Sequence, residues 1–239
     1  MDREPSAALP AEKVKSLVRA ARARMAQASG MVISDYGYGS ATPAAAAAIR
    51  GRGSWPVRVA LDSRYRLHEY AGMGLAAATP NEAEIETAHH QEIAGSADQL
   101  EHLAQASIAR MGIAALVVTR GRDGMTVFER GQAPCTIPVF GSDQALDVTG
   151  AGDTVIAAFT LSMAAGATIL EAAQIANYAG GIVVMKRGTA TVTRAELLGA
   201  LQMDATGATP AMAPVASVGG SGATRVAGRE HRSVRAPRR

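Results

Sequence analysis

Short apolar runs and helix-like segments alternate along the first half of the chain. Residues 11–28 and 100–111 repeat apolar residues at helical spacing, and start signals at Thr42-Pro43 and at Asn81 predict two more helices. Strands that alternate with helices predict an α/β sandwich whose mostly parallel central sheet has helices on both faces. The predicted strands are short apolar runs bounded by glycine, proline or polar residues: 31–34, 57–61, 75–79 and 114–119.

The second half of the chain is predicted to add a hairpin and three helices. Residues 125–130 and 133–140 are strand-like runs separated by Gly131-Gln132, which predicts a hairpin attached to the sheet. The apolar run 155–161 predicts a buried helix, and two more helices are expected at about 169–185 and 193–203. Because ligands of open α/β sheets bind beyond the carboxyl ends of the strands, polar residues there are expected to share one crevice. These residues are Asp35, Asp62, Asn81, Thr119 and the loop that carries Asp153.

The composition is that of one globular domain in a reducing compartment. The chain has 239 residues, of which 48% are hydrophobic and 4% aromatic, which favours helices packed on a sheet over an all-β fold. Its single cysteine, Cys135, excludes an internal disulfide and is expected to be a small buried hydrophobe. No apolar signal region follows Met1, and no uncharged run reaches membrane-spanning length. We therefore expect a cytoplasmic protein without a membrane partner.

The positive charge of the chain belongs to its C-terminal tail. Residues 204–239 carry six arginines against Asp204 and Glu230, a balance of +4, so the net charge of +3 leaves −1 for residues 1–203. The tail is rich in small and polar residues and lacks the apolar surface that would offset the entropy of ordering it. This predicts a folded domain over 1–203 and a disordered basic tail over 204–239. The tail has no interleaved aromatic residues, so a solvated extension is favoured over a nucleic-acid partner.

The strongest chemical signal is the stretch Asp-Val-Thr-Gly-Ala-Gly-Asp-Thr at residues 147–154. Its two glycines permit a tight turn just before a predicted helix, where free backbone N–H groups and the helix dipole favour a phosphate. Asp153 would lie beside that phosphate, a place suited to a base that accepts a proton from an attacking hydroxyl. In the simpler alternative, Thr149 caps the helix and Asp153 complements its dipole, although a cap does not require two glycines.

This stretch resembles the second signature of the ribokinase-like carbohydrate kinases, the PfkB family, with Asp153 at the position of the catalytic base. The resemblance covers about residues 10–203 and implies a ribokinase-like three-layer sandwich, a kinase domain over 1–203, and ATP and Mg²⁺ as cofactors. Asn81 and Glu84 match the family's Asn-x-x-Glu motif, which arranges magnesium, its waters and the nucleotide phosphates. Glu84 is thereby implied as the metal-site residue, while the same pair at a helix start can also form a capping box.

The resemblance also implies the remaining site residues. The amides of Gly150, Ala151 and Gly152 would stabilise the charge that develops on the transferred phosphoryl group. A strand-end segment resembles the family's segment near the nucleotide and includes Thr119, Gly121 and Gly124, although such a segment is by itself most often a turn. Asn177, in a helix that resembles the one lining the adenine pocket, would contribute a polar contact.

Two other groups of polar residues suggest chemical sites. Asp35 and Asp62 can pair as acid and base, but both lie at strand ends, where aspartate often starts a turn. Ser63 follows the second of these, where the family typically has proline. His89-His90 resembles a metal site only superficially, because adjacent residues of a helix face apart and no further ligand accompanies them.

Within the family, four segments are similar to the kinase domain that phosphorylates D-glycero-β-D-manno-heptose 7-phosphate at its anomeric hydroxyl: 34–36, 79–82, the run after Asp153 and 188–192. That resemblance implies sugar phosphate and ATP as substrates in the ADP-heptose route to lipopolysaccharide. Family members have a strand, a sugar-binding segment and a lid before the helix that matches 11–28, so we expect an N-terminal part and lid to be absent. The expected partner is a second copy of the chain or a complementing N-terminal segment. Two alternatives stay open: a truncated, non-catalytic nucleotide-binding remnant, and a family kinase for another sugar or nucleoside.

Overall fold

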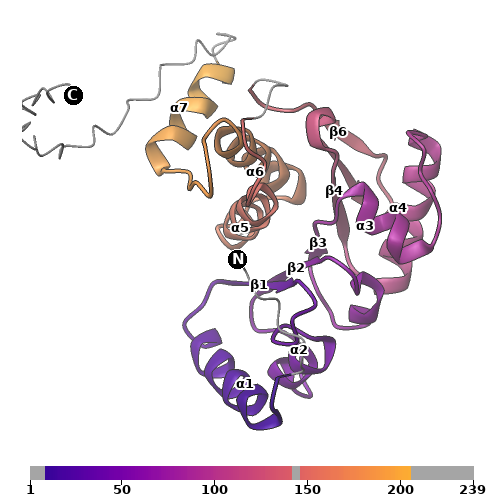
Figure 1. The fold of residues 1–239 in the computed structure, drawn as a ribbon, viewed down its shortest axis with the longest axis vertical. Coiled ribbons are helices and arrows are strands. Elements are labelled where there is room, and N and C mark those ends of the chain that lie inside the picture. Colours follow the sequence, from indigo (N-terminus) through magenta and orange to yellow (C-terminus); the bar gives the residue numbers. More distant parts are fainter. Residues whose placement is uncertain (1–8, 142–145, 206–239) are drawn as a thin grey trace, which may run out of the picture. The chain divides into compact units, whose positions relative to one another are not determined.

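The computed structural model describes residues 9–141 and 146–205, the last two by their backbone only (Figure 1). Its helices are α1 (Ala11–Met25), α2 (Pro43–Arg50), α3 (Glu82–His89), α4 (Ala97–Met111), α5 (Ala151–Ala164), α6 (Ile169–Val184) and α7 (Arg194–Ala205). Its strands are β1 (Gly30–Asp35), β2 (Arg58–Ser63), β3 (Ala77–Ala78), β4 (Ala115–Thr119), β5 (Met125–Glu129) and β6 (Cys135–Ile137). Two short 3₁₀ helices, η1 (Leu67–Tyr70) and η2 (Gly121–Asp123), complete the element order.

The six strands form one sheet in the order β1-β2-β3-β4-β5-β6. The first four are parallel, whereas β5 and β6 pair antiparallel as the predicted hairpin. β3 has two residues where the sequence predicts five, but Ala76 and Thr79 still donate backbone hydrogen bonds to Val59 and Leu61 of β2. Every parallel strand therefore ends at the same edge of the sheet, which gathers the polar residues that follow the strands.

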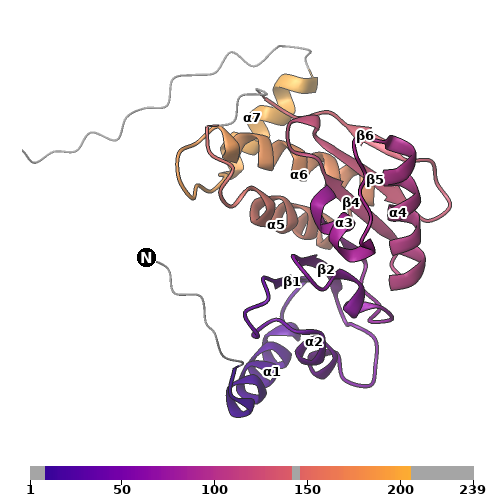
Figure 2. The same cartoon turned by 45° about the vertical axis from the view of Figure 1, so that its right-hand side comes forward.

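Helices cover both faces of this sheet, as predicted. Along β4, Leu116 and Val118 pack in a cluster with α3 and α4, whereas Ala115 and Val117 pack in a second cluster with α5 and α6. Successive side chains of a strand point to opposite faces, so one apolar strand can serve two cores. Figures 1 and 2 show the same arrangement, with α3 and α4 on one side of the strands and α5 and α6 on the other.

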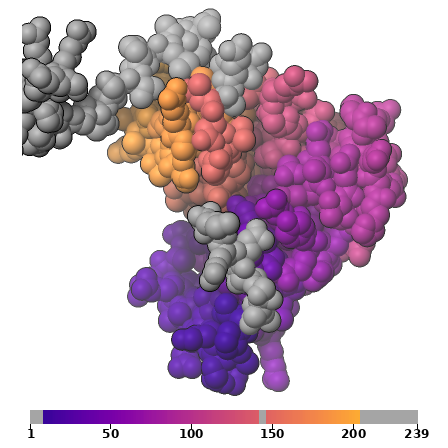
Figure 3. Space-filling view, viewed as in Figure 1, coloured from indigo at the N-terminus to yellow at the C-terminus, as the bar shows by residue number. Residues whose placement is uncertain are grey.

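Local capping signals explain where several helices begin and end. The Thr42 hydroxyl accepts a hydrogen bond from Ala45 N at the start of α2, where Pro43 occupies the first turn. Gly112 ends α4 in a left-handed conformation with φ 70°. α1 ends at Met25, three residues before its predicted end, and has no buried residue; its indigo atoms lie at the surface in Figure 3.

The prediction that 155–161 forms a buried helix is only half right. Val155, Ile156, Phe159 and Thr160 of α5 are buried, but Leu161 is 72% exposed. A helix that packs against a sheet on one side buries only the residues that share that side, whatever the apolarity of the run.

The predicted domain boundary at residue 203 falls inside α7, which continues to Ala205. The rest of the predicted basic tail, 206–239, lies outside the described residues, as do 1–8 and 142–145. Among the described residues, no helix combines the length and the apolarity needed to cross a membrane.

Candidate active site

A polar crevice lies where the carboxyl ends of the parallel strands meet the start of α5. The predicted convergence is confirmed for Asp35, Asp62, Asn81 and Thr119, and the Asp153 loop reaches the crevice through Gly152. The remaining lining residues are Tyr36, Arg64, Thr79 and Glu84. A backbone bridge between Asn81 and Thr119 extends the β3–β4 pairing to the crevice edge. Sheet topology thus assembles the crevice from segments far apart in the sequence.

The turn at the start of α5 leaves its first backbone amides without a side-chain cap. Gly150 is the N-cap residue, with φ 77°, a conformation that favours glycine, and no side chain accepts a hydrogen bond there. The simpler alternative of a Thr149 cap is therefore wrong. The amides of Ala151 and Gly152 belong to this first turn, where the helix dipole adds positive potential; the Ala151 amide also donates to Val148 O at 3.2 Å. The geometry suits an anion.

Asp147 holds this turn in place, although it was not among the predicted site residues. Its carboxylate accepts hydrogen bonds from Thr149 N at 2.9 Å and from Gly188 N at 3.0 Å. These hydrogen bonds, that of Thr149 foremost, lower the pKa of the Asp147 carboxyl. An aspartate that accepts a hydrogen bond from the backbone amide two residues later is a common turn motif. The second partner of Asp147, Gly188, lies 41 residues away along the sequence.

Asp153 receives a hydrogen bond that no sequence signal indicates. The Tyr36 hydroxyl, in the loop after β1, donates to Asp153 Oδ1 at 2.9 Å across 117 residues of sequence. Burial, followed by this hydrogen bond, raises the pKa of Tyr36 to about 12, so the phenol remains protonated near neutral pH. Asp153 thus belongs to the first turn of α5, and its carboxylate accepts a hydrogen bond from a phenol that stays protonated.

Carboxylates from two other elements give the crevice a negative field. Burial, then Glu84 and Asp153, raises the pKa of Asp62 to about 7 from its ordinary 3.8. The pKa of Glu84 is also raised, chiefly by burial, while its hydrogen bonds with Asn81 and the nearby Arg64 oppose the shift. A cation bound here would relieve the repulsion between these groups.

Asn81 and Glu84 form the capping box at the start of α3. Glu84 N donates to Asn81 Oδ1 at 2.8 Å, and Asn81 N donates to Glu84 Oε2 at 2.9 Å. Both side chains also line the crevice, so the cap does not remove them from it. Oxygen donors in a negative field fit Mg²⁺, which keeps most of its waters and takes few protein ligands. Among the described residues, no three His, Cys, Asp or Glu side chains form a metal-binding group of their own.

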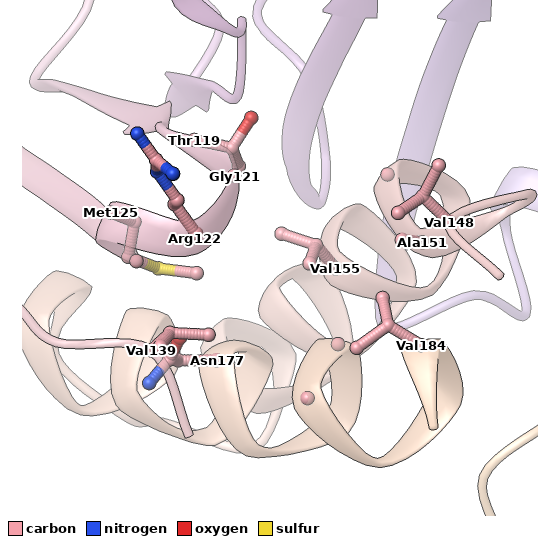
Figure 4. A pocket seen from close by; sticks show the side chains of 14 residues that line it. Thr119, Gly121, Arg122, Met125, Val139, Val148, Ala151, Val155, Asn177 and Val184 are labelled. Carbon is pink, nitrogen blue, oxygen red and sulfur yellow. The ribbon is translucent and has the colours of Figure 1, made fainter. Parts of the chain in front are cut away.

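An apolar cavity borders the other side of the α5 start (Figure 4). It lies between the segment 119–125 and the helices α5 and α6, and it includes the predicted Thr119, Gly121, Gly124 and Asn177. Its apolar walls come from Met125, Val139, Val148, Val155 and Val184.

Asn177 lines the apolar cavity but already has a structural partner. Its side-chain Nδ2 donates to Pro138 O at 2.8 Å, which joins α6 to the segment after β6. Gly181, one turn further along α6, approaches the backbone of Phe140 so closely that a Cβ would overlap Phe140 O. Glycine at this position therefore lets the segment after β6 lie against α6 and close one wall of the cavity. A contact between Asn177 and a nucleotide stays a prediction.

Asp35 serves the structure rather than acid–base chemistry. Its side chain is 1% exposed, and Oδ2 accepts hydrogen bonds from Arg66 Nε at 2.9 Å and the Tyr70 hydroxyl at 2.8 Å. Its Oδ1 accepts from Gly37 N at 2.9 Å and pairs with Arg66 as well. The proposed pairing of Asp35 with Asp62 as acid and base is not seen, because Arg66 neutralises the first.

The adjacent histidines 89 and 90 diverge. His89 Nε2 lies 2.7 Å from Ser107 Oγ, and His68 Nε2 lies 3.0 Å from the same oxygen. His90 ends α3 in the left-handed conformation with φ 53°. His89 is therefore a packing residue between α3 and α4.

The Asp62→Asn variant should become more stable relative to the parent chain as the pH rises from 4 to 8. Between the ordinary pKa of 3.8 and the folded value of about 7, the folded chain holds a proton that the unfolded chain has lost, so parental stability falls with pH. The difference should reach on the order of 2–4 kcal/mol. Urea unfolding at pH 4, 6 and 8 without magnesium measures this difference, with the exposed Asp98→Asn as control. A difference that is flat with pH would contradict the raised pKa of Asp62.

The comparisons with known proteins agree with this architecture. The model of the pfkB family carbohydrate kinases matches residues 4–196. The bifunctional protein HldE of Gluconacetobacter diazotrophicus is 37% identical over 216 residues, which are 88% of this chain and 44% of that protein. The bifunctional protein HldE of Caulobacter vibrioides is 40% identical over 186 residues, covering 76% of this chain and 38% of that protein. The chain thus spans about two fifths of the length of these relatives.

Solved structures share the fold at low sequence identity. Phosphofructokinase-2 from Escherichia coli, in complex with substrates and products, has a TM-score of 0.68 and 19% identity over 83% of this chain and 64% of that chain. Arabidopsis thaliana ribokinase, complexed with ribose and ATP, has a TM-score of 0.63 and 20% identity over 82% of this chain and 60% of that chain. The predicted ribokinase-like α/β fold is thereby confirmed. With the family model matching most of its length, the chain belongs to the PfkB family of carbohydrate kinases.

Proposed function

We propose that this chain carries out ATP-dependent phosphorylation of a sugar phosphate, with Asp153 as the general base. The observation that carries the proposal is that the two cavities meet at the start of α5: Gly152 and Thr119 line both of them. An apolar cavity suits a nucleobase, a polar crevice suits a polyhydroxylated acceptor, and the uncapped amides between them suit the phosphate that passes from one to the other.

The proposed reaction is an in-line phosphoryl transfer. The acceptor oxygen attacks the γ-phosphorus, the bond from that phosphorus to the β–γ bridging oxygen breaks, and the acceptor proton passes to Asp153. The amides of Gly150, Ala151 and Gly152 would stabilise the charge on the transferred group. Asn81 and Glu84 would hold hydrated Mg²⁺, which supplies neutralisation of phosphate charge when bound.

The proposed acceptor is D-glycero-β-D-manno-heptose 7-phosphate, phosphorylated at its anomeric hydroxyl in the cytoplasm on the route to ADP-heptose and lipopolysaccharide. Support comes from the resemblance of four segments to that kinase domain and from relatives that are 37% and 40% identical. The negative field of Asp62 and Glu84 favours the hydroxyl end of such an acceptor in the crevice over its phosphate end.

The test combines nucleotide binding with turnover. Isothermal titration with Mg-ATP measures binding, and a phosphotransfer assay then compares heptose 7-phosphate with the same heptose lacking its phosphate, fructose 6-phosphate, ribose and adenosine. We expect turnover to be highest with heptose 7-phosphate and to vanish when EDTA removes magnesium. Preference for another acceptor would replace the proposed sugar, whereas nucleotide binding without turnover on any acceptor would identify a non-catalytic remnant.

A further inference from the structure

The hydrogen bond between Tyr36 and Asp153 has no part in the reaction as described above. It joins the loop after β1 to the first turn of α5, and Tyr36 is among the residues that line the polar crevice. The phenol oxygen lies 2.9 Å from Oδ1 of the proposed base, so any acceptor hydroxyl must share the carboxylate with it or displace it. A carboxylate has two oxygens and can accept at both.

The backbone around Tyr36 is anchored on both sides. Asp35, the preceding residue, is held by Arg66 and by the buried Tyr70. The following residue, Gly37, donates its amide to Asp35 Oδ1 and adopts φ 83°, a left-handed conformation that favours glycine. The loop position of Tyr36 is therefore set by the partly buried ion pair of Asp35 and Arg66, while Tyr36 itself stays 39% exposed at the crevice.

The charges around this contact favour a donor at this place. Besides burial, the negative charges of Asp153, of Asp62 in β2 and of Glu84 in α3 help to raise the pKa of Tyr36. The positive charge of Arg64, after β2, opposes the raised pKa of Glu84. The carboxylates of Asp62 and Glu84 repel the negative charge of Asp153. A phenol that donates a hydrogen bond to Asp153 stabilises that charge. With a pKa near 12, Tyr36 donates throughout the pH range in which the chain would work.

We propose that Tyr36 is a positioning residue for phosphoryl transfer: by donating to Oδ1 of Asp153 it fixes the carboxylate so that Oδ2 faces the acceptor hydroxyl. This inference rests on the proposed role of Asp153 as the base. In the transfer step, Oδ2 takes the acceptor proton while the acceptor oxygen bonds to the γ-phosphorus and ADP leaves. Tyr36 keeps its own proton and forms no covalent bond.

The test is Tyr36→Phe, which keeps the ring and removes only the donor. A lost charge-assisted hydrogen bond should lower kcat about 10- to 100-fold. KM for ATP and for the acceptor should change less than about threefold, because the contact serves the transferring proton rather than binding. The control Tyr65→Phe removes a hydroxyl from a ring that is 59% exposed and lies under the guanidinium of Arg64, and it should leave kcat unchanged.

A double-mutant cycle with Asp153→Asn separates this inference from the proposed function. If Tyr36 acts through Asp153, adding Tyr36→Phe to Asp153→Asn should lower the residual rate no further. Full activity of Asp153→Asn, or no turnover by the parent chain, would overturn both proposals. Loss of activity in Asp153→Asn with unchanged kcat in Tyr36→Phe would overturn the inference alone.

Three other outcomes would also overturn the positioning role. Faster turnover or a lower acceptor KM in Tyr36→Phe would show that the phenol competes with the acceptor for Asp153. An equal further loss in the Asp153→Asn background would show a role independent of the base. Phosphate on Tyr36, detected by mass spectrometry after incubation with Mg-ATP, would make the phenol an acceptor.

Discussion

The Asp153→Asn variant is expected to lose phosphotransfer by about 10²- to 10⁴-fold, the usual contribution of a general base. Asparagine keeps the size of the side chain and can still accept from the Tyr36 hydroxyl, but it cannot take the acceptor proton. Nucleotide affinity should stay nearly constant or increase, because an anion beside the phosphate is lost. Steady-state rates with the best acceptor, together with Mg-ATP titration, measure the two effects separately.

A matched control distinguishes catalysis from the helix dipole. Asp98 lies in the first turn of α4, as Asp153 lies in the first turn of α5, so both carboxylates interact with a helix start. Asp98→Asn should therefore reproduce any loss of stability that comes from the dipole without any loss of rate. A rate drop smaller than tenfold in Asp153→Asn would remove Asp153 from the mechanism.

The Gly124→Ala variant is expected to be the most damaging small substitution in the apolar cavity. Gly124 has φ 80° and ψ −123°, and a Cβ there would overlap Ile137 O and lie 2.6 Å from Val139 N. The neighbouring atoms are backbone and cannot rotate away, so strain and overlap should together cost about 3–5 kcal/mol. For a domain of this size the melting temperature should fall on the order of 10 °C.

Gly121→Ala is the matched control for this effect. Gly121 belongs to the same turn and also has a left-handed φ, 56°, but no atom lies within 4 Å of the Cβ position. Its substitution should cost only the conformational strain, about 1–2 kcal/mol. Thermal melting of both variants measures the difference, and equal losses would show that the close approach between the η2 turn and the segment after β6 contributes nothing.

Local sequence signals were sufficient to predict most elements of this fold. Thr42-Pro43 marks the start of α2, the Asn81 and Glu84 pair marks the start of α3, and Gly112 marks the end of α4. Each of these signals is a hydrogen bond or a backbone conformation that involves residues within four positions of one another. The glycine turn before α5 is local in the same sense, which is why the sequence could predict a tight turn with Asp153 in the first turn of the helix.

The alternation of strands and helices also predicted which residues share the crevice. Parallel strands joined by helices must end on the same edge of the sheet, so Asp62, Asn81 and Thr119 converge there regardless of packing details. The order of elements along the chain contains that information.

Only the tertiary structure decided how these polar residues are paired. Asp35 turned out to be neutralised by Arg66, Asp147 holds Gly188, and Tyr36 reaches Asp153 across 117 residues. Such partners depend on how the strands and helices pack against one another, and sequence spacing contains no signal for them. The same holds for Leu161. The apolar run predicted that it is buried, but α5 packs on one side only and leaves it 72% exposed. The sequence by itself thus determined most of the elements, the glycine turn before α5 and the crevice, whereas long-range packing decided that Asp35 pairs with Arg66 and that Asp153 accepts a hydrogen bond from Tyr36.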